Sequence, residues 1–286
     1  MERTARRLRC AAPVLLAALP LPVAAAQAQS GTCRERLSSV PAQAAMYDVA
    51  WVTAERLDAL DGVEVVIAAR GGQDLSRYGL RHSHLAFLLC EGDGRWRAIH
   101  LLNRCKTDHS QLYREGLSNF IGESGGHTDL RIGVPVPAVR AALQAMLQPP
   151  AIQPRVLHEP KYNVAAYPFA TDFQNSNQWV LEVLDAAIAQ ANGQPPLINR
   201  TQAQQWLRTQ DYRPSVLHLG LGKRLGARLF VANATTTDHP AGERISGNYS
   251  VVTVESVFDF LRAGERLQQE FPIPHAKVEG AAPPAP

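Results

Sequence analysis

The sequence is poor in the features that mark several common protein classes. Its 286 residues include only four cysteines, too few for a fold held together mainly by disulfides. It contains no H-E-x-x-H and no C-x-x-C, so the spacings typical of zinc sites are missing. Internal repeats are also missing, as is an apolar run of the roughly 20 residues that a membrane span needs. We therefore expect a globular protein with no metal and no other cofactor.

The N-terminal residues predict a targeting segment. Four arginines precede residues 11–25, which are nearly all Ala, Leu, Pro and Val, and Ala26-Gln27-Ala28 supplies the small-x-small pattern of a signal peptidase site. We predict a signal peptide at 1–28 and a periplasmic or secreted bacterial protein without a transmembrane span after cleavage. An uncleaved anchor is the alternative.

Little charge of one sign remains once this segment is removed. Lysine and arginine exceed aspartate and glutamate by three in the whole sequence, 29 against 26. The predicted signal peptide holds four arginines and one glutamate, so the remainder is neutral. A neutral chain with interspersed signs gives no electrostatic case for binding nucleic acid or an anionic membrane.

The rest of the chain predicts one α+β domain over 29–270. Apolar or β-branched runs predict strands at 63–69, 83–89, 96–102, 130–136, 216–221, 228–232 and 249–254. Helical spacing predicts helices at 137–147, 180–188, 202–209 and 257–269. Because this order is not a regular βαβ alternation, we expect an antiparallel sheet with helices packed on it. Residues 148–154 are a crossover or a linker between two lobes, and 271–286 are a predicted disordered tail.

Histidines flank a predicted hairpin turn, Gly92-Asp93-Gly94. A three-residue turn centred on Asp93 would place His84 opposite Leu102 and diagonal to His100, close enough for one imidazole to orient the other. A two-residue turn would separate the two histidines. A strand histidine is also commonly a packed residue with one satisfied nitrogen, so a structural role is the simpler interpretation.

The same region leaves two further interpretations open. Five histidines (His82, His84, His100, His109 and His127) fall within 46 residues, which makes zinc an alternative, although no ligand pair has carboxylate backing. Cys90 and Cys105 are candidates for a disulfide, or for a pair of buried thiols.

A second cluster of polar residues lies much later, where Tyr162-Asn163 is followed eleven residues on by NSNQWVLEVL. Asn175 and Gln178 resemble a capping box, which places Ser176 in the first turn of a helix. Backbone N–H groups at a helix start are free of intrahelical partners and can stabilise an oxyanion. Simple helix capping explains the same residues without any chemistry.

Together these segments resemble a known family. The motifs DLSRYGLRHSHLAF, RWRAIHLLNRC, LYREGLSNF, YN and NSNQWVLE, spread over residues 50–261, closely resemble an uncharacterised bacterial family of secreted proteins classed as a domain of unknown function. More distantly, their order is similar to that of circularly permuted papain-like hydrolases, which include cell-wall endopeptidases and lecithin retinol acyltransferase. Those enzymes carry S-H and a small apolar residue on an early strand, a polar residue on the next strand, and N-C at a later helix start.

The resemblance implies a permuted papain-like fold and a role for each matching residue. His84 matches the base, His100 the orienting residue, and Ser176 takes the place of the cysteine nucleophile. Serine is a departure, because its hydroxyl is hardly ionised at neutral pH and needs a stronger base than a thiol does. The implied activity is hydrolysis of an amide or ester in cell-envelope material.

A non-catalytic periplasmic ligand-binding or assembly protein on the same fold is the alternative. In that interpretation the histidines are structural, and hydrogen bonds to an unknown envelope ligand come from Tyr162, Asn163, Asn175 and Asn177.

Overall fold

The computed structural model describes residues 39–72, 75–105, 107–123, 129–151, 153–219 and 233–274. The predicted signal peptide, the predicted strand at 228–232, His127 and the predicted tail from residue 275 onward lie outside these residues. No helix within the described ranges is both long enough and apolar enough to cross a membrane.

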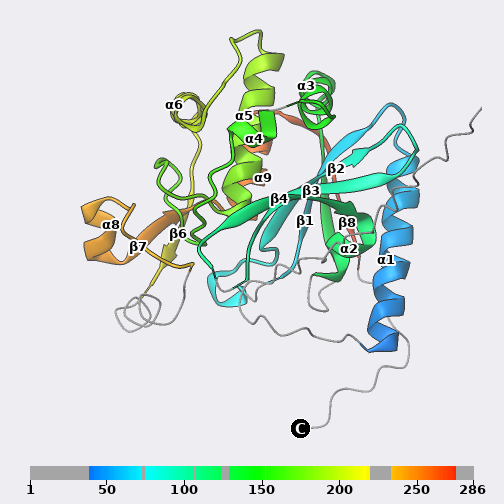
Figure 1. Ribbon diagram of the computed structural model, residues 1–286, viewed down its shortest axis with the longest axis horizontal. Helices are drawn as coiled ribbons and strands as arrows, with labels where there is room; N and C mark the ends of the chain where they lie inside the picture. Colours follow the sequence, from blue (N-terminus) through cyan, green and yellow to red (C-terminus); the bar gives the residue numbers. More distant parts are fainter. Residues whose placement is uncertain are drawn as a thin grey trace, which may run out of the picture.

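A six-stranded antiparallel sheet forms the centre of the molecule, in the order β4-β3-β2-β1-β5-β8 (Figure 1). Its strands are β1 (Val65–Arg70), β2 (His84–Cys90), β3 (Trp96–Asn103), β4 (Ser110–Gly116), β5 (Leu130–Pro135) and β8 (Leu267–Ile273). A separate two-stranded sheet pairs β6 (Ser215–His218) with β7 (Asn248–Val251). The predicted α+β class and antiparallel sheet are confirmed.

Helices cover both faces of the large sheet (Figure 1). They are α1 (Val40–Asp58), the 3₁₀ turn η1 (Ser76–Tyr78), α2 (Leu117–Gly122), α3 (Pro137–Leu147), α4 (Gln153–Val156), α5 (Ser176–Ala191), α6 (Arg200–Thr209), α8 (Ala241–Ser246) and α9 (Val254–Ala263). Because strand side chains alternate, Ile67 and Phe87 pack toward α3, α5 and α9, whereas Ala68 and Leu88 pack toward α1 and α2. Each large apolar side chain so buried contributes about 2 kcal/mol.

Helix α5 lies on the face of the sheet that α3 and α9 also cover. Asn175 is its N-cap and accepts a hydrogen bond from the backbone N–H of Gln178 at 2.8 Å, so Ser176 is the first helical residue, as the sequence predicts. All but two of its sixteen residues are buried, including the charged residues Glu182 and Asp185. The helix ends near Gly193, whose φ of +70° suits a glycine.

The β2–β3 hairpin has the predicted three-residue turn. Cys90 pairs with Trp96 and Phe87 with Ile99, a register centred on Asp93. Beyond Phe87 the start of β2 bonds to α5 instead: the N–H of Leu85 donates to Asn177 Oδ1 at 3.0 Å, and Asn177 Nδ2 donates to the carbonyl of Ser83 at 3.2 Å. The amide of Asn177 therefore fastens the first turn of α5 to the sheet.

The C-terminal elements differ from the prediction. The helix expected over 257–269 is α9, which ends at Ala263, and the chain then forms β8 beside β5. Gly264 follows α9 directly and Arg266 turns back to bond Leu261, which frees the next residues to extend. Residues 271–273, predicted to begin the disordered tail, are therefore part of a strand.

Candidate functional site

Four side chains from four elements form one hydrogen-bonded row, which we call the Ser–His–His–Glu network. Ser176 Oγ lies 3.2 Å from His84 Nδ1, and His84 Nε2 lies 2.8 Å from His100 Nδ1. His100 Nε2 lies 2.9 Å from Glu115 Oε1. The structure thus brings together the three predicted catalytic residues and adds Glu115, which sequence reasoning missed.

The sheet and α2 hold the two imidazoles in place. His84 opens β2 and His100 lies within β3, and their ring centroids are 5.1 Å apart in an edge-to-face arrangement. Phe120 of α2 packs against both rings, with its centroid 5.5 Å from that of His100. Because each ring is fixed by packing as well as by hydrogen bonds, the network is held on rigid elements rather than on loops.

Three of the four members of the network are almost fully removed from water, whereas the Glu115 side chain is 18% exposed. Ser176 and His84 are each 7% exposed and His100 is 0% exposed. Burial lowers the pKa of His84 well below its usual value of 6.5, and the nearby charges of Arg70 and His100 lower it further. Burial also lowers the pKa of His100, against the opposing effect of its hydrogen bond to Glu115. Both imidazoles are therefore neutral at neutral pH, the form in which a histidine accepts a proton.

A buried ion pair lies beside the network. Arg70 Nη2 is 2.7 Å from Glu123 Oε2, and the Arg70 side chain is only 4% exposed. Burial raises the pKa of Glu123 to about 7, although Arg70 opposes the shift. Arg70 is also the residue opposite His84 in the β1–β2 ladder, which explains its effect on the pKa of that histidine.

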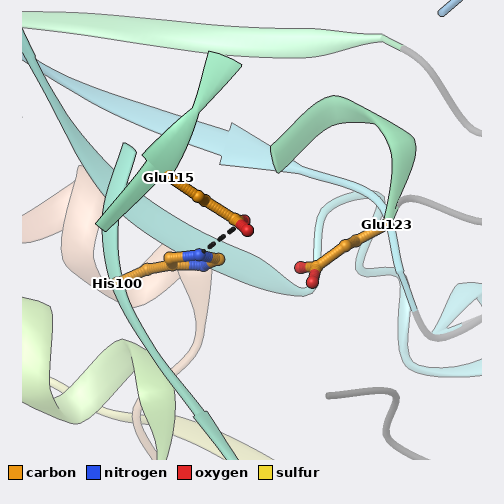
Figure 2. Close-up of side chains that lie close together, drawn as sticks. All are labelled: His100, Glu115 and Glu123. Carbon is orange, nitrogen blue, oxygen red and sulfur yellow. Dashed lines mark hydrogen bonds and ion pairs between the residues drawn. The ribbon is translucent and has the colours of Figure 1, made fainter. Parts of the chain in front are cut away.

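Figure 2 shows the carboxylates of Glu115 and Glu123 pointing into the same space beside His100. One ligand atom from each of these three residues lies within 4.8 Å of the others, so they could hold a metal ion. In the structure Glu115 bonds His100 and Glu123 bonds Arg70. The positive charge that these two carboxylates face is therefore the guanidinium of Arg70.

The predicted ligand-binding side chains face inward. Burial raises the pKa of Tyr162, against an opposing hydrogen bond to Ser176, so Tyr162 adjoins the network. Asn163 Oδ1 accepts from the N–H groups of Ala165 and Thr235, and its Nδ2 donates to the Thr235 carbonyl at 2.9 Å. Asn175 caps α5 and Asn177 bonds β2. Asn175 and Asn177 thus organise the helix start, whereas the Asn163 side chain ties its own loop to Thr235.

The cysteines do not pair as expected. Cys105 is disulfide-bonded, whereas Cys90 is a free thiol, so the predicted Cys90–Cys105 disulfide is wrong. Cys90 is the last residue of β2, where it pairs with Trp96 next to the hairpin turn. Of the histidines of the zinc alternative, only His84 and His100 adjoin each other among the described residues: His82 bonds Asp129 at 3.1 Å, and the exposed His109 lies 3.7 Å from Asp108.

Three residues of the site escape sequence reasoning. Arg70, Glu115 and Glu123 lie on β1, on β4 and at the end of α2, and only the order of the strands brings them together. For Glu115 one signal exists, because it lies inside LYREGLSNF, one of the motifs that carry the family resemblance. The sequence gives no comparable signal for the other two.

The fold and the site define a mixed α+β protein that buries a Ser–His–His–Glu network at a helix start. The chain belongs to the family described as an uncharacterized protein conserved in bacteria (DUF2145), whose model matches residues 56–261. No curated protein and no solved structure matches the chain.

Proposed function

We propose that the protein is an exported hydrolase that cleaves an amide or ester bond through an acyl-serine intermediate at Ser176. The observation that carries the proposal is the 3.2 Å contact between Ser176 Oγ, at the first residue of α5, and Nδ1 of the buried, neutral His84. A hydroxyl within hydrogen-bond reach of a neutral imidazole is the arrangement that activates a serine nucleophile.

In the first half of the reaction, Oγ bonds to the acyl carbon while His84 takes the hydroxyl proton. The resulting oxyanion would lie near the backbone N–H groups of Ser176 and Asn177, which have no intrahelical partner at a helix start. In the resting structure the N–H of Ser176 bonds the Tyr162 hydroxyl, which the oxyanion would displace. His84 then returns the proton to the leaving amine or alcohol as its bond to the acyl carbon breaks. In the second half, water attacks the acyl carbon while His84 takes one of its protons, and His84 then returns that proton to Oγ as the acyl–Oγ bond breaks and the free acid leaves.

The resemblance to circularly permuted papain-like hydrolases supports this proposal and its substrate class. The order of parts is the same: a histidine on an early strand, a polar residue on the neighbouring strand, and a nucleophile that begins a later helix. Cell-wall endopeptidases of that superfamily suggest peptide or ester bonds of the cell envelope as substrate. Serine in place of cysteine implies dependence on His84 rather than on a preformed thiolate.

Export is proposed on two grounds. The basic and then apolar N-terminal sequence is typical of a signal peptide, and a disulfide at Cys105 suits an oxidising compartment. In a bacterial host, we expect the protein in the periplasmic fraction or the medium with its N-terminus near Gln29. A full-length chain retained in the cytoplasm would contradict export.

Two substrates test the hydrolase. With p-nitrophenyl acetate we expect a burst of p-nitrophenolate equal to the enzyme concentration, because acylation precedes slower deacylation. With purified peptidoglycan sacculi we expect soluble fragments. Ser176→Ala abolishes both. If that variant releases product like the wild type in both assays, Ser176 is not the nucleophile.

A non-catalytic envelope-binding protein is the second candidate, favoured by the deep burial of Ser176 and His100. On that account, Ser176→Ala leaves every measured property unchanged, whereas changing Tyr162 weakens retention on sacculi. The two accounts therefore differ in the behaviour of one variant.

A further inference from the structure

The direction of the hydrogen bonds decides whether the network can act as a base. Serine and neutral histidine can each either donate or accept, so the row from Ser176 through His84 to His100 can run in two directions. In one direction His84 Nδ1 accepts from the Ser176 hydroxyl. In the other, Nδ1 carries the hydrogen and donates to Oγ, which leaves no lone pair to receive the serine proton.

The far end of the row removes this ambiguity. A carboxylate accepts hydrogen bonds and, while ionised, donates none, so the 2.9 Å contact to Glu115 requires a hydrogen on His100 Nε2. The lone pair of His100 Nδ1 then accepts from His84 Nε2 at 2.8 Å. His84 Nδ1 is left as an acceptor that faces Ser176 at 3.2 Å.

We propose that Glu115 is a positioning residue that fixes the tautomers of His100 and His84 and thereby makes His84 a base toward Ser176. The inference rests on the proposed function for its purpose, but the tautomers themselves do not depend on catalysis. Glu115 acts through two imidazoles and does not touch the reacting atoms.

The second carboxylate has a different task. Glu123 bonds the guanidinium of Arg70, a buried cation next to His84, at 2.7 Å and so leaves Glu115 to His100. The charged and titratable groups recorded near Glu123 come from β1, β3 and β4: Arg70, His100, Tyr113 and Glu115. Only Glu115 among the two carboxylates bonds an imidazole of the network.

A metal ion at this position would favour the opposite tautomers of His100 and His84. A cation held by His100 Nε2 with Glu115 and Glu123 would take the Nε2 lone pair and leave the hydrogen on Nδ1. His100 would then donate to His84, and His84 would donate to Ser176. The tautomer of His84 therefore reports which of the two arrangements exists.

Long-range ¹H–¹⁵N NMR spectra of ¹⁵N-histidine-labelled protein test the inference. For the wild type we expect the hydrogen on Nε2 of both His84 and His100. In Glu115→Gln, whose amide can donate as well as accept, we expect a substantial Nδ1-H population at both rings. Asp129→Asn is the matched control, because it alters the carboxylate that bonds His82 outside the network; it should leave both rings unchanged.

Either of two results overturns the inference: a hydrogen on Nδ1 of His84 in the wild type, or unchanged tautomers in folded Glu115→Gln. If Glu115→Gln does not fold, the wild-type spectrum decides alone. A protein with the expected tautomers but no Ser176 reactivity would refute the proposed function and leave the positioning role of Glu115 standing.

Discussion

Among the residues that the structure describes, Ser176 with His84 forms a buried serine–histidine pair and Ser110 with His158 a part-buried one, and the closer of the two pairs lacks the features expected of a nucleophile. Ser110 Oγ lies 3.0 Å from His158 Nε2, compared with 3.2 Å between Ser176 Oγ and His84 Nδ1. Ser110 lies on the edge strand β4, and its hydroxyl also faces the carbonyls of Glu159 at 3.2 Å and Pro160 at 3.4 Å. Ser176 instead begins a helix.

The difference lies in where the hydroxyl hydrogen goes. Carbonyls only accept, so these two oxygens compete with His158 for the one hydroxyl hydrogen of Ser110, and we expect the imidazole to supply the hydrogen between Ser110 and His158. At Ser176 we expect the hydroxyl to donate to the imidazole, because Glu115 and His100 leave His84 Nδ1 as an acceptor. Proximity of serine and histidine is therefore insufficient, and the direction of the hydrogen bond separates the two pairs.

The largest expected effect comes from removing each histidine in turn. Loss of a general base costs roughly 10²–10⁴-fold in rate. We expect His84→Ala to slow the reaction of Ser176 with diisopropyl fluorophosphate by that factor, and His158→Ala to leave the rate near that of the wild type. Equal losses in the two variants would mean that the comparison reflects general damage to the fold rather than base catalysis.

A thiol at the helix start gives the next largest effect. In Ser176→Cys, the helix N-terminus should lower the pKa of the introduced thiol. At Cys90, burial raises the thiol pKa, and Asp58 and Glu64 raise it further. At pH 7 we expect iodoacetamide to alkylate position 176 at least about tenfold faster than Cys90, as measured by peptide mass spectrometry. Faster reaction at Cys90 would show that the helix start does not activate a nucleophile.

The pH dependence follows from the buried imidazole. His84 accepts a proton only while it is neutral, that is, above its pKa, and burial holds that pKa well below 6.5. The rate of reaction with diisopropyl fluorophosphate should therefore stay constant as the pH falls from 8 to 6.5 and decline only below that. A decline centred at 6.5 or higher would indicate a solvent-exposed base instead.

The smallest effect compares two helix caps. Asn175 and Asn199 each cap a helix by accepting from the backbone N–H three residues on, at 2.8 and 2.9 Å. Replacing either with alanine should cost about 1 kcal/mol of unfolding free energy in urea. Only Asn175→Ala should also slow the reaction of Ser176, because only that helix orients the nucleophile. Equal rates in the two variants would show that the start of α5 does not orient the nucleophile.

Local patterns predict part of this site well. The glycines around Asp93 predict the three-residue turn and hence the β2–β3 register, and Asn175 with Gln178 predicts the start of α5. Both are short-range features, so the residues that decide them lie within a few positions of each other.

The parts that sequence reasoning missed depend on distant contacts. Strand β4 was not predicted, since SQLYREG lacks the β-branched residues typical of strands, and β4 carries Glu115. The pattern of 257–269 favours a helix throughout, but residues from Leu267 onward gain more by pairing with β5. Likewise, nothing near Arg70 in the sequence indicates that a glutamate 53 positions later will bind it.

The most direct test of the central claim reads both serines in one sample. Wild-type protein is incubated with diisopropyl fluorophosphate, a reagent small enough for a side chain that is 7% exposed, and is then digested and analysed by mass spectrometry. Serine Oγ displaces fluoride, so a modified residue gains the diisopropylphosphoryl group. We predict modification of the peptide that contains Ser176 and none at Ser110. An unmodified Ser176, or equal modification of both serines, would contradict the account.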